Sequence, residues 1–359
     1  MWRFVMTDWA QFRREDVPVP FPGPGEVLLQ VARVGVCGSD LAIIHGKHPY
    51  ARPPLVLGHE VSGIVSAQGP DGAGPPPGTR VTVIPHLVCG ACRACRAQRY
   101  NLCNQLKCIG AQADGAHAEY LVMPAEMVLP IPDDMSLADA AMVEPAAVAY
   151  HGVNRTAISP DDRVLIVGAG PIGAFALQAA KALSARAVYV ADLLDSRLNL
   201  AMQLGADGVI NTSRESLADG LTRLLDGPEE INVFADCVGG AGAVLDQCIA
   251  LANRGSRIVM LGVLGTEFKL PHLPDFVEHE LTLFGTTMYT PRDYHDVLAL
   301  MAVGRIRTEG IITHRYPLER APEVIAAIDA HRDRYFKVLL VGDVADIPPF
   351  AEETLDELP

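Results

Sequence analysis

Four of the eight cysteines stand in a stretch of fifteen residues, at the spacing of a metal-binding loop. They are Cys89, Cys92, Cys95 and Cys103, separated by two, two and seven residues. One such loop can wrap a tetrahedral zinc ion at about 2.3 Å from each sulfur, and four thiolates leave no coordination position for a substrate. Two disulfides or four free thiols are the alternative, but cysteines two residues apart are hard to cross-link to each other. The spacing therefore predicts a structural zinc site.

A second set of metal-ligand residue types is scattered along the chain before the glycine-rich segment described next. Cys37 follows a predicted strand, and His59 and Glu60 follow a proline-rich turn. Glu144 stands in the apolar run 140–149, where a buried carboxylate is costly unless a cation or a hydrogen-bond donor meets it. A thiolate, an imidazole and one or two carboxylates suit a catalytic zinc ion that keeps one position open. Taken singly, Cys37 or His59 would more often be a packed core residue, so the hypothesis of a catalytic metal depends on the combination.

A glycine-rich turn follows the predicted buried strand at 164–167 and precedes a predicted helix. Its residues are Gly168, Gly170, Pro171, Ile172 and Gly173. Glycines at this spacing let the backbone approach a pyrophosphate, and the amides at the start of the following helix favour its negative charge. Tight turns also use glycine for steric reasons alone. The strand before, the helix after and an acidic residue beyond the next strand favour a dinucleotide site.

That acidic residue is Asp192, nineteen residues after Gly173. A carboxylate at this place can accept hydrogen bonds from both ribose hydroxyls of an adenosine, whereas a 2′-phosphate would meet like charge. NAD is therefore favoured over NADP. Arg197, one turn later, could partly offset the repulsion, and the alternative is a surface arginine that pairs with Asp195.

Hydrophobic periodicity divides the chain into two kinds of sequence. Strands are predicted at 25–36, 61–66 and 80–84, and the proline- and glycine-rich stretch Gly69–Gly78 is expected to be an exposed loop. From about Pro145, short β-branched runs alternate with amphipathic stretches, which predicts an α/β fold with a doubly wound parallel sheet. Its strands are expected at 164–167, 188–191, 232–235, 257–261 and 281–284, and its helices at 172–183 and 196–204. A helix at 293–303 and the apolar run Lys337–Val341 follow.

The composition excludes several classes of protein. With 359 residues the chain is long enough for about two domains. A formal net charge of -14 and a pI near 5.2 disfavour nucleic acid and anionic membranes as partners and favour a small molecule. Charged residues interrupt Met1–Glu15, so it has no signal-peptide core, and no run of about 18 apolar residues predicts a membrane span. We expect a cytoplasmic protein, in which a reducing environment keeps cysteines available as ligands.

The order of these motifs resembles that of the zinc-containing medium-chain dehydrogenases. Cys37-Gly-Ser-Asp, Gly58-His-Glu, the four-cysteine loop, Glu144-Pro and the Gly168 turn follow one another as in that superfamily, and the resemblance covers nearly the whole chain. Glutamate rather than cysteine at position 144 is similar to the sorbitol and threonine dehydrogenase branch. The segments 83–86, 290–294 and 313–317 look most like bacterial sugar-acid and polyol dehydrogenases.

The resemblance implies a fold, two zinc ions and NAD. It implies a GroES-like, mostly β catalytic domain formed by residues 1–146 and 286–359, and a Rossmann NAD-binding domain at 147–285. Cys37, His59 and either Glu60 or Glu144 would bind the catalytic zinc ion, a Lewis acid for oxidation of a secondary hydroxyl on a polyol, sugar acid or cyclitol. Ser39 would relay the proton, or else only cap the helix after Cys37. Further cofactor contacts are expected at Leu261, Gly262, Val263, Thr286 and Thr287. The resemblance also implies a homodimer or homotetramer.

Two departures from the family pattern bear on mechanism and substrate. Ala42 stands where many relatives have a relay histidine, which leaves His45 and His48 as nearby candidates. The segment 285–287 stands where sorbitol dehydrogenases hold polyol hydroxyls with an arginine and a tyrosine, which argues against sorbitol itself. Oxidation of L-threonine is the alternative within the branch. A non-catalytic nucleotide-binding protein is an alternative of another class, and the presence of both Cys37 and His59 disfavours it.

Overall fold

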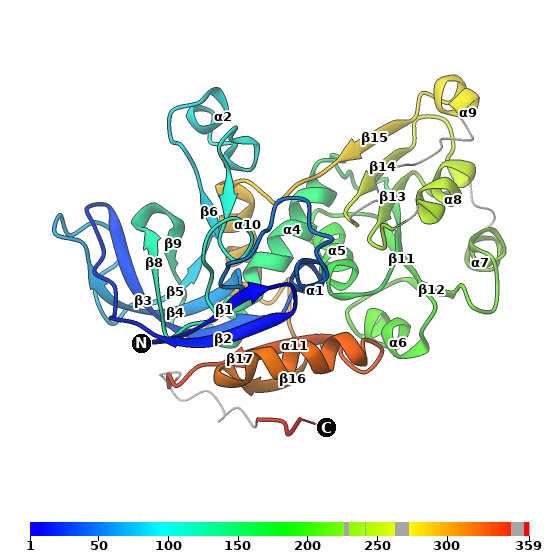
Figure 1. The fold of residues 1–359 in the computed structure, drawn as a ribbon. Coiled ribbons are helices and arrows are strands. Elements are labelled where there is room, and N and C mark those ends of the chain that lie inside the picture. The colour runs from blue at the N-terminus through cyan, green and yellow to red at the C-terminus, as the bar shows by residue number, and fades with distance from the viewer. Residues whose placement is uncertain (226–229, 241, 263–272, 346–354, 359) are drawn as a thin grey trace. The chain divides into compact units, whose positions relative to one another are not determined.

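The computed structural model describes residues 1–225, 230–240, 242–262, 273–345 and 355–358. The chain divides into two compact units, each built on its own sheet (Figure 1). Unit 1 comprises Met1–Glu144, Thr290–Tyr294 and Thr308–Pro359, and unit 2 comprises Pro145–Tyr289 and His295–Arg307.

The second boundary between the units differs from the one predicted after residue 285. Most of α10 (Pro291–Ala302), together with the residues up to Arg307, belongs to unit 2. These residues bond to α5 (Pro171–Ala182): the Arg307 amide donates to the Gln178 side chain at 2.8 Å. The two residues are 129 positions apart, and hydrophobic periodicity does not reveal such a contact.

A mostly antiparallel sheet of seven strands forms the core of unit 1. The strand order is β16-β17-β3-β4-β5-β9, and β8 also pairs with β3. The strands are β3 (Glu26–Gly35), β4 (Glu60–Gln68), β5 (Arg80–Val83), β8 (Tyr120–Pro124), β9 (Val128–Pro130), β16 (Ile312–Pro317) and β17 (Lys337–Val341). Both faces of β3 are covered, so its sequence is an almost continuous apolar run. The three predicted strands correspond to β3, β4 and β5, and Gly69–Gly78 contains neither helix nor strand.

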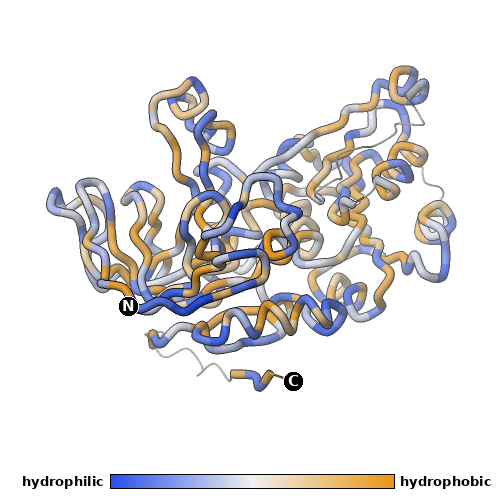
Figure 2. Tube along the Cα trace, in the orientation of Figure 1, coloured by the Kyte–Doolittle hydropathy of each residue, from blue (hydrophilic) through white to orange (hydrophobic). Residues whose placement is uncertain are grey.

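Smaller elements surround this sheet. The remaining strands of unit 1 are β1 (Trp2–Asp8), β2 (Gln11–Asp16), β6 (His86–Leu87) and β7 (Lys107–Cys108). Its helices are α1 (Gly38–Ile44), α2 (Arg93–Arg96), α3 (Leu137–Ala141) and α11 (Ala321–Ala330), with short 3-10 turns η1 (Tyr100–Leu102), η2 (Ala125–Met127) and η4 (Leu318–Arg320). Along α11 hydrophobic and hydrophilic residues alternate with the helical turn (Figure 2). Ala321, Val324, Ile325 and Ile328 are buried, the spacing of a helix with one apolar face.

The sheet of unit 2 is parallel throughout, in the order β12-β11-β10-β13-β14-β15. Its strands are β10 (Arg163–Val167), β11 (Ala187–Asp192), β12 (Gly208–Asn211), β13 (Val233–Asp236), β14 (Arg257–Met260) and β15 (Thr282–Gly285). Besides α5 and α10, its helices are α4 (Val143–Asn154), α6 (Asp195–Gln203), α7 (Leu217–Leu224), α8 (Ala243–Leu251) and α9 (Leu273–Glu278). The chain starts in the middle of the sheet, moves to one edge and then continues from the middle to the other edge. Ligands of such sheets bind where this order reverses, beside β10 and β13.

The α/β class and the doubly wound parallel sheet predicted from the sequence are confirmed. The predicted strands and helices of unit 2 begin and end within two residues of the observed ones, although β12, α4, α7, α8 and α9 had no counterpart in the prediction. Among the described residues, no helix has both the length and the apolar character needed to cross a lipid bilayer.

Candidate active site

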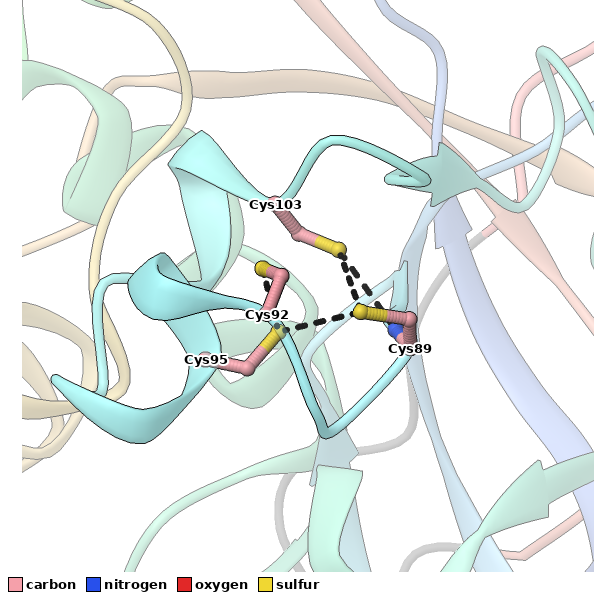
Figure 3. A group of neighbouring side chains, drawn as sticks. All are labelled: Cys89, Cys92, Cys95 and Cys103. Carbon is pink, nitrogen blue, oxygen red and sulfur yellow. Dashed lines mark hydrogen bonds between the residues drawn. The ribbon is translucent and has the colours of Figure 1, made fainter.

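The four-cysteine loop of unit 1 brings its sulfurs together around one point (Figure 3). The Sγ atoms of Cys89 and Cys95 are 3.9 Å apart, those of Cys92 and Cys95 3.5 Å, and those of Cys89 and Cys103 3.6 Å. Four sulfurs at about 2.3 Å from a tetrahedral zinc ion are about 3.8 Å from one another, so the loop fits that ion. None of the four forms a disulfide. Hydrogen bonds from the Cys95 and Asn104 amides lower the pKa of the Cys92 thiol to about 6, which favours the thiolate that a metal requires, whereas burial and the neighbouring thiols raise the pKa of Cys95.

A second group of ligand atoms lies where β3 ends and β4 begins. Cys37 follows β3 and caps the N-terminus of α1, His59 directly precedes β4, and Glu60 is the first residue of β4. One ligand atom from each of the three lies within 4.8 Å of the others. His59 and Glu60 are buried, with 8% and 0% of their surface exposed. Sulfur, nitrogen and oxygen donors in a mostly buried setting fit a zinc ion with an open position.

Asp40 holds this group in place. Its carboxylate accepts a hydrogen bond from the Cys37 amide at 2.9 Å and lies 3.7 Å from Nδ1 of His59. On the other side of the ring, Nε2 of His59 is 3.4 Å from the Ser39 hydroxyl. Burial alone would lower the pKa of His59, but the charge of Asp40 and a hydrogen bond with Cys37 outweigh it and raise that pKa well above its usual value. Asp40 had no predicted role.

Ser39 does not cap α1. Cys37 is the N-cap residue and Ser39 is the second residue of the helix, so the alternative role of Ser39 as a cap is wrong. Its hydroxyl is directed instead at the His59 ring.

Lys337 is a further residue of this site that the sequence analysis missed. Its Nζ donates to a carboxylate oxygen of Glu60 at 2.5 Å and to the Val36 carbonyl at 3.0 Å. The two side chains are 4% and 0% exposed. A charged residue at the start of an apolar strand was the available signal, because a buried ammonium requires a partner.

Glu144 is buried at the start of α4, with 5% of its surface exposed. It is not among the three residues whose ligand atoms lie within 4.8 Å of one another. Its negative charge nevertheless acts on Lys337. Of the two carboxylates considered as ligands, Glu60 is the one beside Cys37 and His59.

The two histidines considered as relay groups have different surroundings. His45 is exposed, and its Nε2 lies 2.8 Å from the Asp329 carboxylate. Nδ1 of His48 accepts a hydrogen bond from the Ala51 amide at 3.2 Å. Burial, followed by the charges of His59 and Arg52, lowers the pKa of His48.

In unit 2 the three glycines of the turn after β10 have different spatial requirements. Gly168 has a φ of +97°, a conformation that side chains disfavour. A Cβ on Gly173 would lie 1.8 Å from the Gly168 carbonyl oxygen, so this glycine lets α5 pack against the turn. A Cβ on Gly170 would have no neighbour within 4 Å. Gly170 lies at the N-terminus of α5, a twelve-residue helix that begins with Pro171 and Ile172. A pyrophosphate could approach the backbone in the space beside Gly170.

Asp192 stands at the end of β11 beside that turn. Its carboxylate accepts hydrogen bonds from the amides of Ala169 at 2.7 Å and Leu194 at 3.0 Å. Arg197 lies 3.8 Å from the same carboxylate, while Asp195 binds Arg214. The pairing of Arg197 with Asp195 is therefore not the one observed. A cavity of about 600 Å³ is lined by Gly168, Asp192 and Arg197 together with residues of three neighbouring segments.

The remaining residues predicted to contact the cofactor lie at the ends of β14 and β15. The amides of Leu261 and Gly262 both donate to the Asp236 carbonyl, at 2.8 and 2.9 Å. Thr286 and Thr287 directly follow β15, and the Thr286 hydroxyl is buried without a hydrogen-bond partner among the described residues. An unpartnered buried hydroxyl at the carboxyl end of a Rossmann strand fits a bound cofactor. Val263 lies outside the described residues.

Two family models match the chain. The model for the alcohol dehydrogenase GroES-like domain matches residues 23–133, and the model for zinc-binding dehydrogenases matches residues 171–303. The first match covers five strands of the unit 1 sheet, from β3 to β9, and the second covers the parallel sheet from β11 to β15. Together with the strand orders, these matches confirm the predicted GroES-like and Rossmann fold classes.

Known proteins are similar over most of the chain. L-Galactonate-5-dehydrogenase of Escherichia coli K12 is 36% identical over 85% of this chain and 88% of its own. L-Threonine 3-dehydrogenase of Pyrococcus furiosus is 34% identical over 84% of this chain and 87% of its own. The crystal structure of a short chain alcohol dehydrogenase, RspB of E. coli CFT073, complexed with NADH, has a TM-score of 0.88 at 30% identity and covers 95% of this chain and 99% of its own. This chain belongs to the zinc-dependent medium-chain dehydrogenase superfamily, in the branch of polyol and threonine dehydrogenases, and is an oxidoreductase of the zinc alcohol dehydrogenase type.

Proposed function

We propose that the protein oxidises a secondary hydroxyl of a polyol, sugar acid or cyclitol to the ketone, with NAD as the hydride acceptor. The observation that carries the proposal is the group formed by Cys37, His59 and Glu60, whose ligand atoms lie within 4.8 Å of one another. The similarity to a sugar-acid dehydrogenase supports this substrate class. In this proposal unit 1 is the catalytic domain and unit 2 binds the cofactor.

Each residue of the catalytic group has a distinct task. Cys37, His59 and Glu60 would hold a zinc ion, which supplies a Lewis acid for the substrate hydroxyl. Asp40 faces Nδ1 of His59, which leaves Nε2 available to the metal. The Ser39 hydroxyl, 3.4 Å from that nitrogen, would accept the substrate proton and pass it outward. Glu144, a second buried carboxylate near this group, would be an alternative ligand when the coordination changes.

Three features of unit 2 support NAD as the cofactor. Gly170 leaves open space at the start of α5 for the pyrophosphate. Asp192 lines the adjoining cavity and can accept the hydroxyls of an adenosine ribose. The Thr286 hydroxyl and the backbone at Leu261 and Gly262 would contact the nicotinamide half.

Oxidation of L-threonine is the second candidate. A named L-threonine 3-dehydrogenase is almost as similar to this chain as the sugar-acid enzyme, at 34% against 36% identity. The two reactions use the same metal and cofactor residues, so they differ only in the substrate contacts. The homodimeric or homotetrameric assembly and the cytoplasmic location stay predictions.

Substrate profiling tests the proposal directly. The purified protein, with its zinc content measured by elemental analysis, is supplied with NAD and a panel of polyols, sugar acids, cyclitols and L-threonine, and NADH formation is followed by absorbance. We expect about two zinc ions per chain, one for each ligand group, and turnover with a member of the first three classes. Turnover with threonine alone would favour the second candidate. A protein with at most one zinc ion per chain and no turnover would contradict both.

The variant Cys37→Ser links the activity to the proposed site. We expect it to lose turnover by a factor of at least about 10³ and to lose one of the two zinc ions, because a catalytic zinc ion needs its thiolate. Cys248→Ala is the matched control, since Cys248 is a buried residue of the unit 2 core. The control should retain both zinc ions and its turnover. Retained activity in Cys37→Ser would refute the site.

A further inference from the structure

Three neighbouring strands of unit 1 place Lys337, Gly35 and Glu60 on one face of the sheet. β17, β3 and β4 are adjacent, and their register pairs Leu339 with Gly35 and Gly35 with Glu60. Residues paired across strands point to the same face, and so do residues two apart in one strand. Lys337 is two residues from Leu339, so its side chain starts on the face that carries Glu60.

Gly35 of β3 has no side chain that could separate the lysine from the glutamate. The Lys337 ammonium reaches over β3 to the Glu60 carboxylate at 2.5 Å, and the Val36 carbonyl accepts a second hydrogen bond at 3.0 Å. Gly35 makes this possible, because a Cβ there would lie 1.9 Å from Oε2 of Glu60. The glycine is therefore needed for the space occupied by the carboxylate, and its φ is not in the left-handed region.

Two hydrogen bonds fix the position of the Lys337 ammonium. They run to the Glu60 carboxylate and to the Val36 carbonyl, and the side chains of Lys337 and Glu60 are 4% and 0% exposed. An ammonium held by two acceptors in a buried place has little freedom to move. It is suited to fix the position of a carboxylate.

We propose that Lys337 is a positioning residue, which holds the Glu60 carboxylate where it can bind a metal ion together with Cys37 and His59. The proposal rests on the proposed function, because it concerns the same catalytic zinc site. Lys337 itself touches neither metal nor substrate in this role. Without it, the carboxylate would lose both its direction and the charge that stabilises it in a buried place.

Metal affinity is the readout that separates this role from a general loss of activity. Cobalt(II) replaces zinc in the purified protein, and its affinity is measured by competition with a chelator while its visible absorption reports the ligand set. Loss of a partner that orients a metal ligand typically weakens binding about 10- to 100-fold. We expect this loss, and a shifted absorption band, in Lys337→Met at the catalytic site, with the four-cysteine site unchanged. Lys181→Met is the matched control, since Lys181 forms a partly exposed ion pair with Asp207 in unit 2.

A double-mutant cycle tests whether Lys337 acts through Glu60. If it does, Glu60→Gln alone and Glu60→Gln with Lys337→Met bind cobalt with equal affinity, because the carboxylate that the lysine positions is already gone. The double variant removes both charges of the buried pair, so it remains informative where Lys337→Met alone folds poorly.

Gly35→Ala tests the need for space beside the Glu60 carboxylate without changing any charge. We expect it to weaken cobalt binding at the catalytic site by about tenfold or more, since the methyl group would displace the Glu60 carboxylate. Gly38→Ala is the matched control, because a Cβ on Gly38 has no neighbour within 4 Å.

The outcomes separate this inference from the proposed function. Unchanged or tighter cobalt binding in Lys337→Met overturns the positioning role, as does a loss that persists undiminished in the Glu60→Gln background. Cobalt binding at the catalytic site that survives Cys37→Ser would instead overturn the metal site, and with it the proposed function.

Discussion

Asp192 illustrates how much one side chain contributes to the cofactor site. Its carboxylate already accepts hydrogen bonds from the amides of Ala169 and Leu194, so it is fixed before a cofactor binds. We expect Asp192→Ala to raise the KM for NAD by about 10- to 100-fold, the value of one or two hydrogen bonds to a charged group. The effect on NADP should be smaller, because the same change removes a charge that repels the 2′-phosphate.

Steady-state kinetics with both cofactors check this prediction. Asp195→Ala is the control, since Asp195 is an exposed residue of α6 that pairs with Arg214. An equal loss for NAD and NADP would mean that Asp192 supports only the fold of the turn.

Residue types, together with the resemblance to the zinc-containing dehydrogenases, pointed to the candidate catalytic site. Cys37, His59 and Glu60 offer a sulfur, an imidazole nitrogen and a carboxylate oxygen, and a zinc ion binds all three kinds of donor. The choice between Glu60 and Glu144 could not be made, because it depends on which side chain the fold directs at the thiolate. Lys337 was not predicted, for a related reason. A lysine is not part of a metal-ligand motif, and its role arises only from the register of β17, β3 and β4.

At the level of secondary-structure elements, two glycines of the turn from β10 into α5 differ in the space that a side chain would have. A Cβ on Gly173 would collide with the Gly168 carbonyl oxygen at 1.8 Å, whereas a Cβ on Gly170 would meet nothing within 4 Å. We therefore expect Gly173→Ala to destabilise unit 2 by about 1–3 kcal/mol, the usual cost of overpacking. Gly170→Ala should leave the unfolding midpoint almost unchanged and weaken NAD binding by about tenfold, because the methyl group would occupy the path of the pyrophosphate.

Thermal unfolding and NAD titration distinguish the two variants. The prediction is contradicted if Gly170→Ala binds NAD normally, or if both variants lose stability equally. Either result would mean that open space at Gly170 has no connection with the cofactor.

Elements with a strong local pattern were predicted well, and elements defined by distant contacts were not. The strands of the parallel sheet have short β-branched runs bounded by turns, and their bounds were correct within two residues. The hairpin of β1 and β2 was not predicted, because β2 is a largely exposed strand rich in charged residues. The assignment of most of α10 to unit 2 was not predicted, because it depends on hydrogen bonds between Arg307 and α5.

For the protein as a whole, buried histidines make the folded state sensitive to acid. His117 is completely buried and neither ring nitrogen has a hydrogen-bond partner among the described residues. Burial, with a contribution from the charge of His59, lowers its pKa to about 3, and burial lowers the pKa of His86 to about 4. In the unfolded chain both pKa values are about 6.5. The unfolded state therefore binds more protons between about pH 6.5 and the folded pKa values, and stability falls as the pH falls through that window.

Urea unfolding at several pH values checks this dependence. We expect the midpoint to fall between pH 7 and pH 5, and the fall to be shallower in His117→Leu, whose buried group cannot be protonated; the difference is at most about 2 kcal/mol at pH 5. His331→Leu, at an exposed position, is the control. An identical pH dependence in wild type and His117→Leu would contradict the account.

The link between Lys337 and Glu60 spans 277 residues, whereas the four cysteines of the other ligand group lie within fifteen. During translation the cysteine loop can capture zinc soon after it leaves the ribosome, because all of its ligands emerge together. If Lys337 positions Glu60 as proposed, the group around Cys37 and His59 would reach its full metal affinity only after β17 is synthesised and pairs with β3. The four-cysteine loop would therefore be able to bind its metal at full affinity earlier in synthesis than the group around Cys37 and His59.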